Sequence, residues 1–227
     1  MSRFSMASEA DQPKSFSFEP EYQVQAEKFI AKYPPGRQQS AVMPLLDLAQ
    51  RQYGWVTRAA VAHIADMLSM PEIRVLEVAT FYFQFQLAPT GENAHIQICG
   101  TTPCMLCGAE SLVDVAKEKI APSAHQVSGD GKLSWEEVEC LGSCSNAPMV
   151  QIDSWVKGGF HSDYYEDLTP ESFGKIIEAF RKGDYPKPGP QNGRFGSEPL
   201  GGLTSLTGKA DNKHNASVDL AIEEGAA

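Results

Sequence analysis

The five cysteines of this chain lie in one stretch, and their spacing could hold a metal centre. The stretch contains a C-x4-C pair at Cys99 and Cys104, a further thiol at Cys107, and a C-x3-C pair at Cys140 and Cys144. An odd number of cysteines leaves at least one thiol outside any disulfide pairing. Where thiols stay reduced, clustered cysteines bind metal or carry redox chemistry more often than they form structural disulfides. We therefore expect a metal or redox centre here.

The thiols of Cys99, Cys104, Cys140 and Cys144 suit a [2Fe–2S] cluster. Such a cluster takes four thiolate ligands, and its negative charge requires N–H donors close to the sulfurs. Glycine, serine and threonine surround both pairs, and these small residues let the backbone approach a sulfur. Each pair comes at the end of a predicted strand, so adjacent strands would bring all four thiols to one end of a sheet.

The spacing alone leaves three alternatives open. Structural zinc prefers closely spaced pairs, and the pairs 104/107 and 140/144 qualify, but Cys99 then has no role. A thioredoxin-type redox pair at Cys104 and Cys107 leaves the second pair without a function. The plant-type ferredoxin spacing uses Cys99, Cys104 and Cys107 with one distant cysteine. Against it, Cys107 begins a predicted helix that leads away from the loop, and the second pair is spaced to act together.

Composition and charge exclude several kinds of binding partner for this chain. The net charge of −10 argues against non-specific binding to nucleic acid or to an anionic membrane surface. No apolar run is long enough to insert into a membrane. The first residues lack the apolar region of a signal peptide and carry acids that a mitochondrial transit peptide avoids, so we expect a cytoplasmic protein. No G-x-G-x-x-G after a strand and no P-loop are found, so we expect no NADH or flavin site on this chain.

Two folded parts are predicted to position the cysteines. Residues 1–18 are polar and are predicted to be disordered. Residues 19–88 show helical periodicity in four segments, which predicts a small helical bundle. The four segments run from Pro20 to Tyr33, from about Ser40 to Gly54, from an N-cap at Thr57 to Ser69, and from Pro71 into the aromatic block 81–85. We expect that block to pack against the next domain rather than to form a partner surface.

Residues 92–185 are predicted to form a thioredoxin-like domain with the order β-α-β-β-β-α, so the fold class is α+β. The predicted elements are a strand at 95–99, a loop, a helix at 108–119, strands at 133–139, 149–152 and about 164–165, and a helix from Pro170 to Gly183. Residues 186–227 are rich in glycine and proline and are predicted to form an extended or disordered tail.

These motifs resemble the thioredoxin-like [2Fe–2S] subunit of respiratory complex I, the E subunit of bacterial NADH–quinone oxidoreductases. The resemblance covers about residues 20–185. It is carried by Gly54-Trp-Val56, Val78-Ala-Thr-Phe-Tyr82, Cys99-Gly-Thr-Thr-Pro-Cys-Met-Leu106, Val138-Glu-Cys-Leu-Gly-Ser-Cys144, Asn146-Ala-Pro-Met-Val-Gln-Ile152 and Tyr164-Tyr-Glu-Asp-Leu-Thr169. It implies a ligand set of Cys99, Cys104, Cys140 and Cys144, and it leaves Cys107 outside the cluster.

The resemblance also implies a function. One [2Fe–2S] cluster would exchange single electrons with FMN on a partner subunit that binds both FMN and NADH, beside a neighbouring iron–sulfur subunit. The assembly would lie on the cytoplasmic side of the inner membrane, in the peripheral arm, and this chain alone would turn over no substrate. The family also includes subunits of NAD-reducing hydrogenases and NAD-dependent formate dehydrogenases, but the tail from Pro188 favours complex I. A structural zinc scaffold and a free ferredoxin remain alternatives.

Two departures from the family pattern are visible. Cys107 is unusual beside a cluster. Residues 154–162 form an insertion between two predicted strands, and we expect it to be a neutral surface loop.

Overall fold

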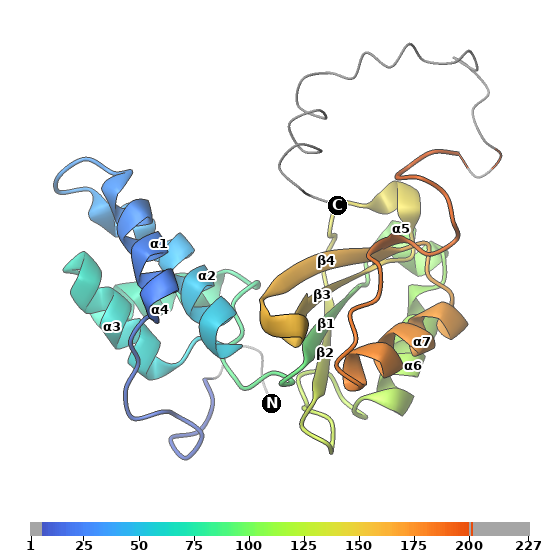
Figure 1. The fold of residues 1–227 in the computed structure, drawn as a ribbon, viewed down its shortest axis with the longest axis horizontal. Helices are drawn as coiled ribbons and strands as arrows, with labels where there is room; N and C mark the ends of the chain where they lie inside the picture. Colours follow the sequence, from blue (N-terminus) through green and yellow to red (C-terminus); the bar gives the residue numbers. More distant parts are fainter. Residues whose placement is uncertain (1–5, 200, 202–227) are drawn as a thin grey trace, which may run out of the picture. The chain divides into compact units, whose positions relative to one another are not determined.

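The computed structural model describes residues 6–199 and residue 201. The described residues up to Asn192 form one compact unit, and those from Gly193 belong to a second. Within the first unit a helical segment comes first and a sheet with helices of its own follows, which confirms the α+β class (Figure 1). No helix in the described residues has both the length and the apolarity to cross a membrane.

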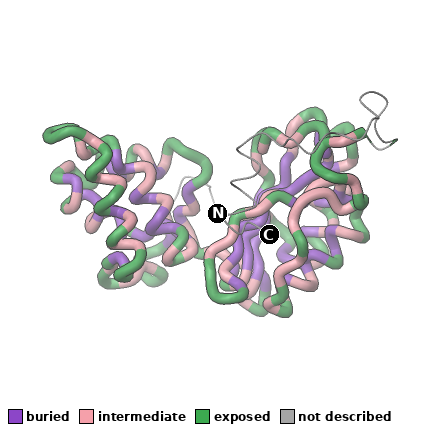
Figure 2. The backbone as a smooth tube through the Cα atoms, turned by 45° about the horizontal axis from the view of Figure 1, so that its top comes forward, coloured by how far each residue is buried: buried purple, intermediate pink, exposed green. Residues whose placement is uncertain are grey.

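The N-terminal helices end where local sequence signals predict. They are α1 (Pro20–Ala31), the 3-10 turn η1 (Gln38–Ala41), α2 (Val42–Tyr53), α3 (Arg58–Leu68) and α4 (Glu72–Phe81). Gly54 ends α2 with φ at 87°, a left-handed conformation that glycine adopts without steric cost. Thr57 caps α3, because its side chain accepts a hydrogen bond from the Ala60 N–H. Leu45, Leu46 and other apolar side chains form the bundle core, and Figure 2 shows the buried stretches of the helices in purple.

The segment before α1 is packed against the bundle, in contrast to the predicted disorder. The Ala7 N–H donates to the carbonyl of Leu87 at 2.8 Å. Gln12 accepts a hydrogen bond from the Arg58 N–H at 2.9 Å, and the Phe18 ring is buried in the bundle core. A few apolar anchors in a polar segment are enough to hold it. Residues 1–5 lie outside the described residues.

The aromatic block 81–85 at the end of α4 is mostly exposed, and of the expected packing against the next domain only one contact region is seen among the described residues: Phe83 lines a cavity together with Gln97 and Gln151 of the sheet. Phe81, Tyr82 and Phe83 are 73%, 40% and 49% exposed. Phe85 is buried, but it belongs to the core of the bundle itself. Phe81 and Tyr82 therefore remain largely exposed.

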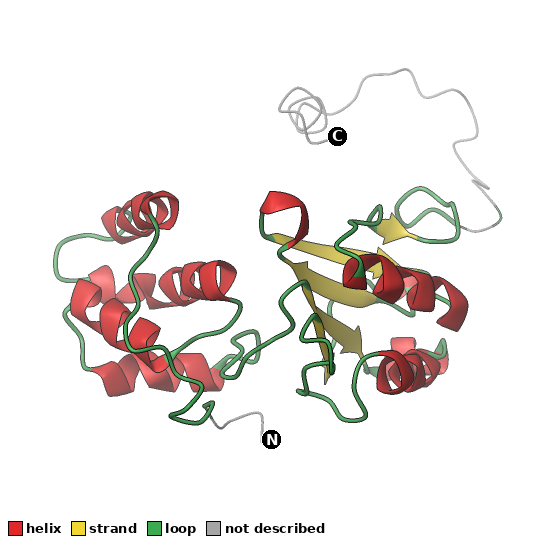
Figure 3. Ribbon diagram, turned by 60° about the horizontal axis from the view of Figure 1, so that its bottom comes forward, coloured by secondary structure: helices red, strands yellow, loops and turns green. Residues whose placement is uncertain are grey.

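In the part of the chain that the structure describes, the sheet has five strands in the order β2-β1-β3-β4-β5. Figure 3 shows its strands in yellow, with red helices beside them. They are β1 (Ala94–Cys99), β2 (Leu133–Val138), β3 (Val150–Ser154), β4 (His161–Glu166) and β5 (Gly189–Pro190). β1 pairs in parallel with β2 and antiparallel with β3. The parallel pair requires a crossover connection, which helix α6 (Ala109–Lys119) supplies.

The two faces of the sheet differ in character. Side chains alternate along a strand, so Ile96, Ile98 and Ile152 share one face. They form an apolar core with α6 and with α7 (Pro170–Arg181), and these two helices pack beside each other. The opposite face carries His95 and Gln97 and receives Gln86, from the segment that follows the bundle.

Two elements were not predicted as such. A short helix α5 (Thr102–Leu106) replaces the predicted loop and carries Cys104. In the predicted tail, Gly189 and Pro190 form β5 beside β4, an edge position that proline tolerates. The tail from residue 202 lies outside the described residues.

Candidate metal centre

The cysteine pairs follow two adjacent strands. In the parallel register of β1 and β2, Cys99 lies opposite Val138, and Cys140 follows only two residues later. Both cysteine loops therefore leave the same end of the sheet. This confirms the expectation that adjacent strands bring the two pairs to one end.

Cys99 and Cys104 form the buried half of the site. Their side chains are 2% and 1% exposed and pack with Ala109 and Met149. Burial raises the pKa of the Cys104 thiol to about 12, helped by its hydrogen bond to Cys99 and the charge of that thiol. The two thiols therefore belong to one buried cluster.

Donors converge on the sulfur of Cys99. Burial alone would raise the pKa of this thiol, but hydrogen bonds from the Thr101 side chain and from the backbone N–H groups of Thr101 and Leu141 lower it below the usual range. The Thr101 hydroxyl lies 3.3 Å from the sulfur. Such donors stabilise a thiolate, which is the form that binds metal. Leu141 belongs to the second cysteine loop, so the two loops already meet at Cys99.

Cys140 and Cys144 form the exposed half. Their sulfurs lie 3.6 Å apart, and this contact with Cys140 is the main cause that raises the pKa of Cys144. Gly142 between them has φ at 91°, which permits the tight loop. The Tyr164 hydroxyl donates to the Leu141 carbonyl at 2.8 Å and holds the loop against β4.

The four thiols are grouped as two pairs, and they do not yet form a closed cage. Within residues 6–199 and 201, no group of three or more His, Cys, Asp or Glu side chains is close enough to hold a metal ion. A metal site rarely exists fully formed before its metal binds, and the second pair lies in an exposed loop. Four thiols at one sheet end, with N–H groups aimed at the innermost sulfur, fit a [2Fe–2S] cluster. Cys107 is exposed at the C-terminal end of α5.

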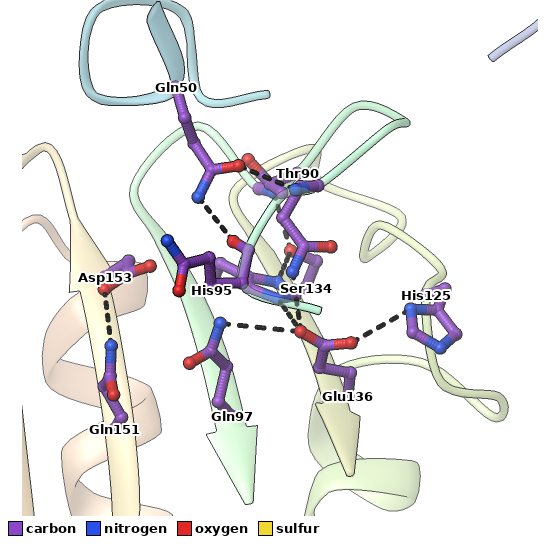
Figure 4. Close-up of polar contacts among 12 residues, drawn as sticks. Gln50, Thr90, His95, Gln97, His125, Ser134, Glu136, Gln151 and Asp153 are labelled. Carbon is purple, nitrogen blue, oxygen red and sulfur yellow. Dashed lines mark hydrogen bonds and ion pairs between the residues drawn. The ribbon is translucent and has the colours of Figure 1, made fainter. Parts of the chain in front are cut away.

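A buried polar cluster holds β1 and β2 together on the face away from α6 (Figure 4). Glu136 is fully buried and accepts hydrogen bonds from Gln86 at 2.6 Å and from His95 Nε2 at 3.2 Å. Nδ1 of His95 lies 2.8 Å from the Ser134 hydroxyl. This cluster was not predicted from the sequence, although polar residues at alternate positions of two predicted strands are its signal.

The insertion at residues 154–162 contacts the helical bundle, so the expectation of a neutral surface loop is wrong. The indole N–H of Trp155 donates to the Arg51 carbonyl at 2.7 Å, near the end of α2. The Arg51 guanidinium lies over the Phe160 ring, 5.1 Å from its centroid. The insertion therefore connects the sheet to α2.

Comparisons with known proteins agree with this geometry. The family model described as "Thioredoxin-like [2Fe-2S] ferredoxin" matches residues 26–181. The E 1 subunit of the NADH-quinone oxidoreductase of Rhizobium meliloti (strain 1021) is 55% identical over 203 residues, which is 88% of this chain and 71% of that protein. The E subunit of the NADH-quinone oxidoreductase of Rickettsia bellii (strain RML369-C) is 49% identical over 168 residues, 74% of this chain and 95% of that protein.

A solved structure shows the same fold. The crystal structure of an NAD+-reducing [NiFe]-hydrogenase in the H2-reduced state matches with a TM-score of 0.50 and 20% sequence identity. The match covers 62% of this chain and 22% of the hydrogenase chain.

Proposed function

Because the chain belongs to the thioredoxin-like [2Fe-2S] ferredoxin family, we propose that it is the electron-transfer subunit of an NADH–quinone oxidoreductase. The support is the likeness to the E subunits of such enzymes, which extends over most of both chains. The fold match to a hydrogenase concerns architecture only.

Cys99, Cys104, Cys140 and Cys144 are the proposed ligands of one [2Fe–2S] cluster, which takes up and releases one electron at a time. The observation that carries this assignment is the parallel pairing of β1 with β2, which places Cys99 opposite Val138 and Cys140 two residues beyond it. Thr101 and Leu141 offset the negative charge of the thiolate through hydrogen bonds. Met149 packs against both buried cysteines and excludes water from that side.

The proposed partners are a subunit that binds FMN and NADH and a neighbouring iron–sulfur subunit. Beside the buried cysteines, Met105 and Leu106 are 45% and 78% exposed, and the 140–144 loop is also open. Apolar side chains exposed next to a redox site are suited to a protein interface. The assembly would form part of the peripheral arm on the cytoplasmic side of the inner membrane. Residues 19–88 and 92–185 are the proposed bundle and cluster domains.

Metal analysis of the isolated chain tests the proposal. We expect two irons and two acid-labile sulfides per chain, and an S = 1/2 EPR signal after reduction. Replacement of Cys99 or Cys140 by serine should perturb or abolish the signal. One zinc and no sulfide, in protein made where cluster assembly works, would instead identify a structural scaffold.

A further inference from the structure

A cavity of about 420 Å³ opens beside the second cysteine loop. One wall comes from α2 with Asp47 and Arg51, and another from the polar face of the sheet with Asp153. Phe160 of the insertion and Cys140 of the second cysteine loop also line it. A partner that reaches the 140–144 loop therefore also reaches this cavity.

Asp153 is a buried carboxylate that lines the cavity without a cation. Its side chain is 6% exposed, and its oxygen accepts hydrogen bonds from Ser162 at 2.6 Å and from Gln151 at 3.3 Å, both neutral donors. No ion pair to Asp153 is found among the described residues. Burying a charge without a counter-charge is unfavourable. Figure 4 shows Asp153 and Gln151 beside the labelled side chains of β1.

The nearby basic groups are already engaged. Arg51 forms an ion pair with Asp47 at 2.8 Å and stacks on Phe160. His95 lies opposite Asp153 in the strand register, but its ring nitrogens contact Ser134 and Glu136 on β2. Glu139 at the rim adds another negative charge. The lining therefore has an excess of carboxylates.

We propose that this cavity is a docking socket for an arginine side chain of the partner subunit that covers the cluster loop. The proposal rests on the proposed function, because it requires that subunit. A guanidinium is planar, donates five hydrogen bonds and stacks on aromatic rings. The socket offers the Asp153 carboxylate and the side-chain amides of Gln97 and Gln151. An ammonium group is a compact point charge and matches such a planar set of acceptors less well than a guanidinium does.

The test measures binding of the cluster-loaded full chain to the FMN-loaded flavin subunit from the same organism. Asp153→Asn keeps an oxygen that can accept from Ser162 and Gln151, and removes only the charge. Gln151→Lys places a cation inside the socket. Asp66→Asn is the matched control, since Asp66 is exposed on α3 and does not line the cavity.

Loss of a buried, hydrogen-bonded charge pair acts mainly on dissociation. We therefore expect the dissociation rate to rise about tenfold or more for Asp153→Asn and for Gln151→Lys, with an unchanged cluster EPR signal. Asp66→Asn should behave as the unchanged chain. Asp153→Asn with an unchanged dissociation rate would overturn the socket and leave the proposed function standing. The socket would also be overturned, and the proposed function left standing, if Asp153→Asn slowed only association and Asp66→Asn slowed it equally. An absent cluster signal, or no association of the unchanged chain, would overturn both.

Discussion

Replacement of Glu136 by leucine should destabilise the fold strongly, because its carboxylate joins three segments of the chain. The side chain is fully buried on β2. One oxygen accepts from Gln86 after the bundle, at 2.6 Å, and from His95 on β1, at 3.2 Å. Gln97, also on β1, lies at 3.5 Å.

Leucine fills a similar space but accepts no hydrogen bond. The ring N–H of His95 and the amide of Gln86 would then lose their acceptor, and each such buried donor costs about 1–3 kcal/mol. For the two donors together the loss is about 2–6 kcal/mol. For a chain of this size, that corresponds to a fall of about 4–24 °C in the melting temperature. Total stabilities are about 5–15 kcal/mol, so the loss is a large fraction.

The assay is a thermal scan of the cluster-loaded chain at a fixed rate, with two companion variants. Glu136→Gln keeps one acceptor oxygen and should cost less than leucine. Glu137→Leu makes the same change at the next residue of β2, whose side chain is exposed, and should shift the midpoint little. If the leucine variants at 136 and 137 melt together, the carboxylate does not hold these segments, and the reasoning fails.

Three further predictions concern single side chains. Cys107→Ala should retain the EPR signal, because Cys107 is exposed outside the two cysteine pairs; a lost signal would favour the plant-type ligand set. Trp155→Phe removes the hydrogen bond to the Arg51 carbonyl. The free energy of unfolding should therefore fall by about 0.5–1.5 kcal/mol. An unchanged melting temperature would show that this contact does not hold α2. Burial, then the hydrogen bond to Asp163, raises the pKa of Tyr185 to about 12. The folded chain keeps this proton longer than the unfolded chain, whose tyrosine titrates near pH ~10, so its stabilisation is lost as pH rises from about 10 to about 12. Melting temperatures measured across that range should fall less steeply for Tyr185→Phe, and equal slopes would refute the assignment.

Local signals predicted most elements of the fold. Alternating apolar residues identified β1, and glycine and threonine signals placed the ends of α2 and α3. Thr169 caps α7 through a reciprocal contact with Ser172, as the Thr-Pro start of that helix suggests. The meeting of the cysteine loops was also predictable, because parallel neighbours place their ends together.

The missed features depend on contacts between distant residues or on elements too short for periodicity. Helix α5 spans only Thr102–Leu106, although Pro103 near its start is a recognisable signal. The contact of Trp155 with Arg51 joins residues 104 positions apart, which no local pattern reports. The N-terminal segment is held by Phe18 and a few hydrogen bonds, too little apolar sequence to outweigh its polar composition.

The buried hydrogen bonds on the polar face of the sheet fix the position of the segments that contact it, although burying polar groups costs free energy. An apolar interface tolerates small shifts, whereas a buried hydrogen bond requires its partner in one place. Gln50 donates to the Gln84 carbonyl and accepts from the Gln86 N–H, while the Gln86 side chain reaches Glu136. This chain of contacts fixes α2 against β2, the strand that leads to Cys140. The same contacts therefore shape both the cavity and the cysteine loop beside it, so disruption of Gln50 should impair partner docking as well as stability.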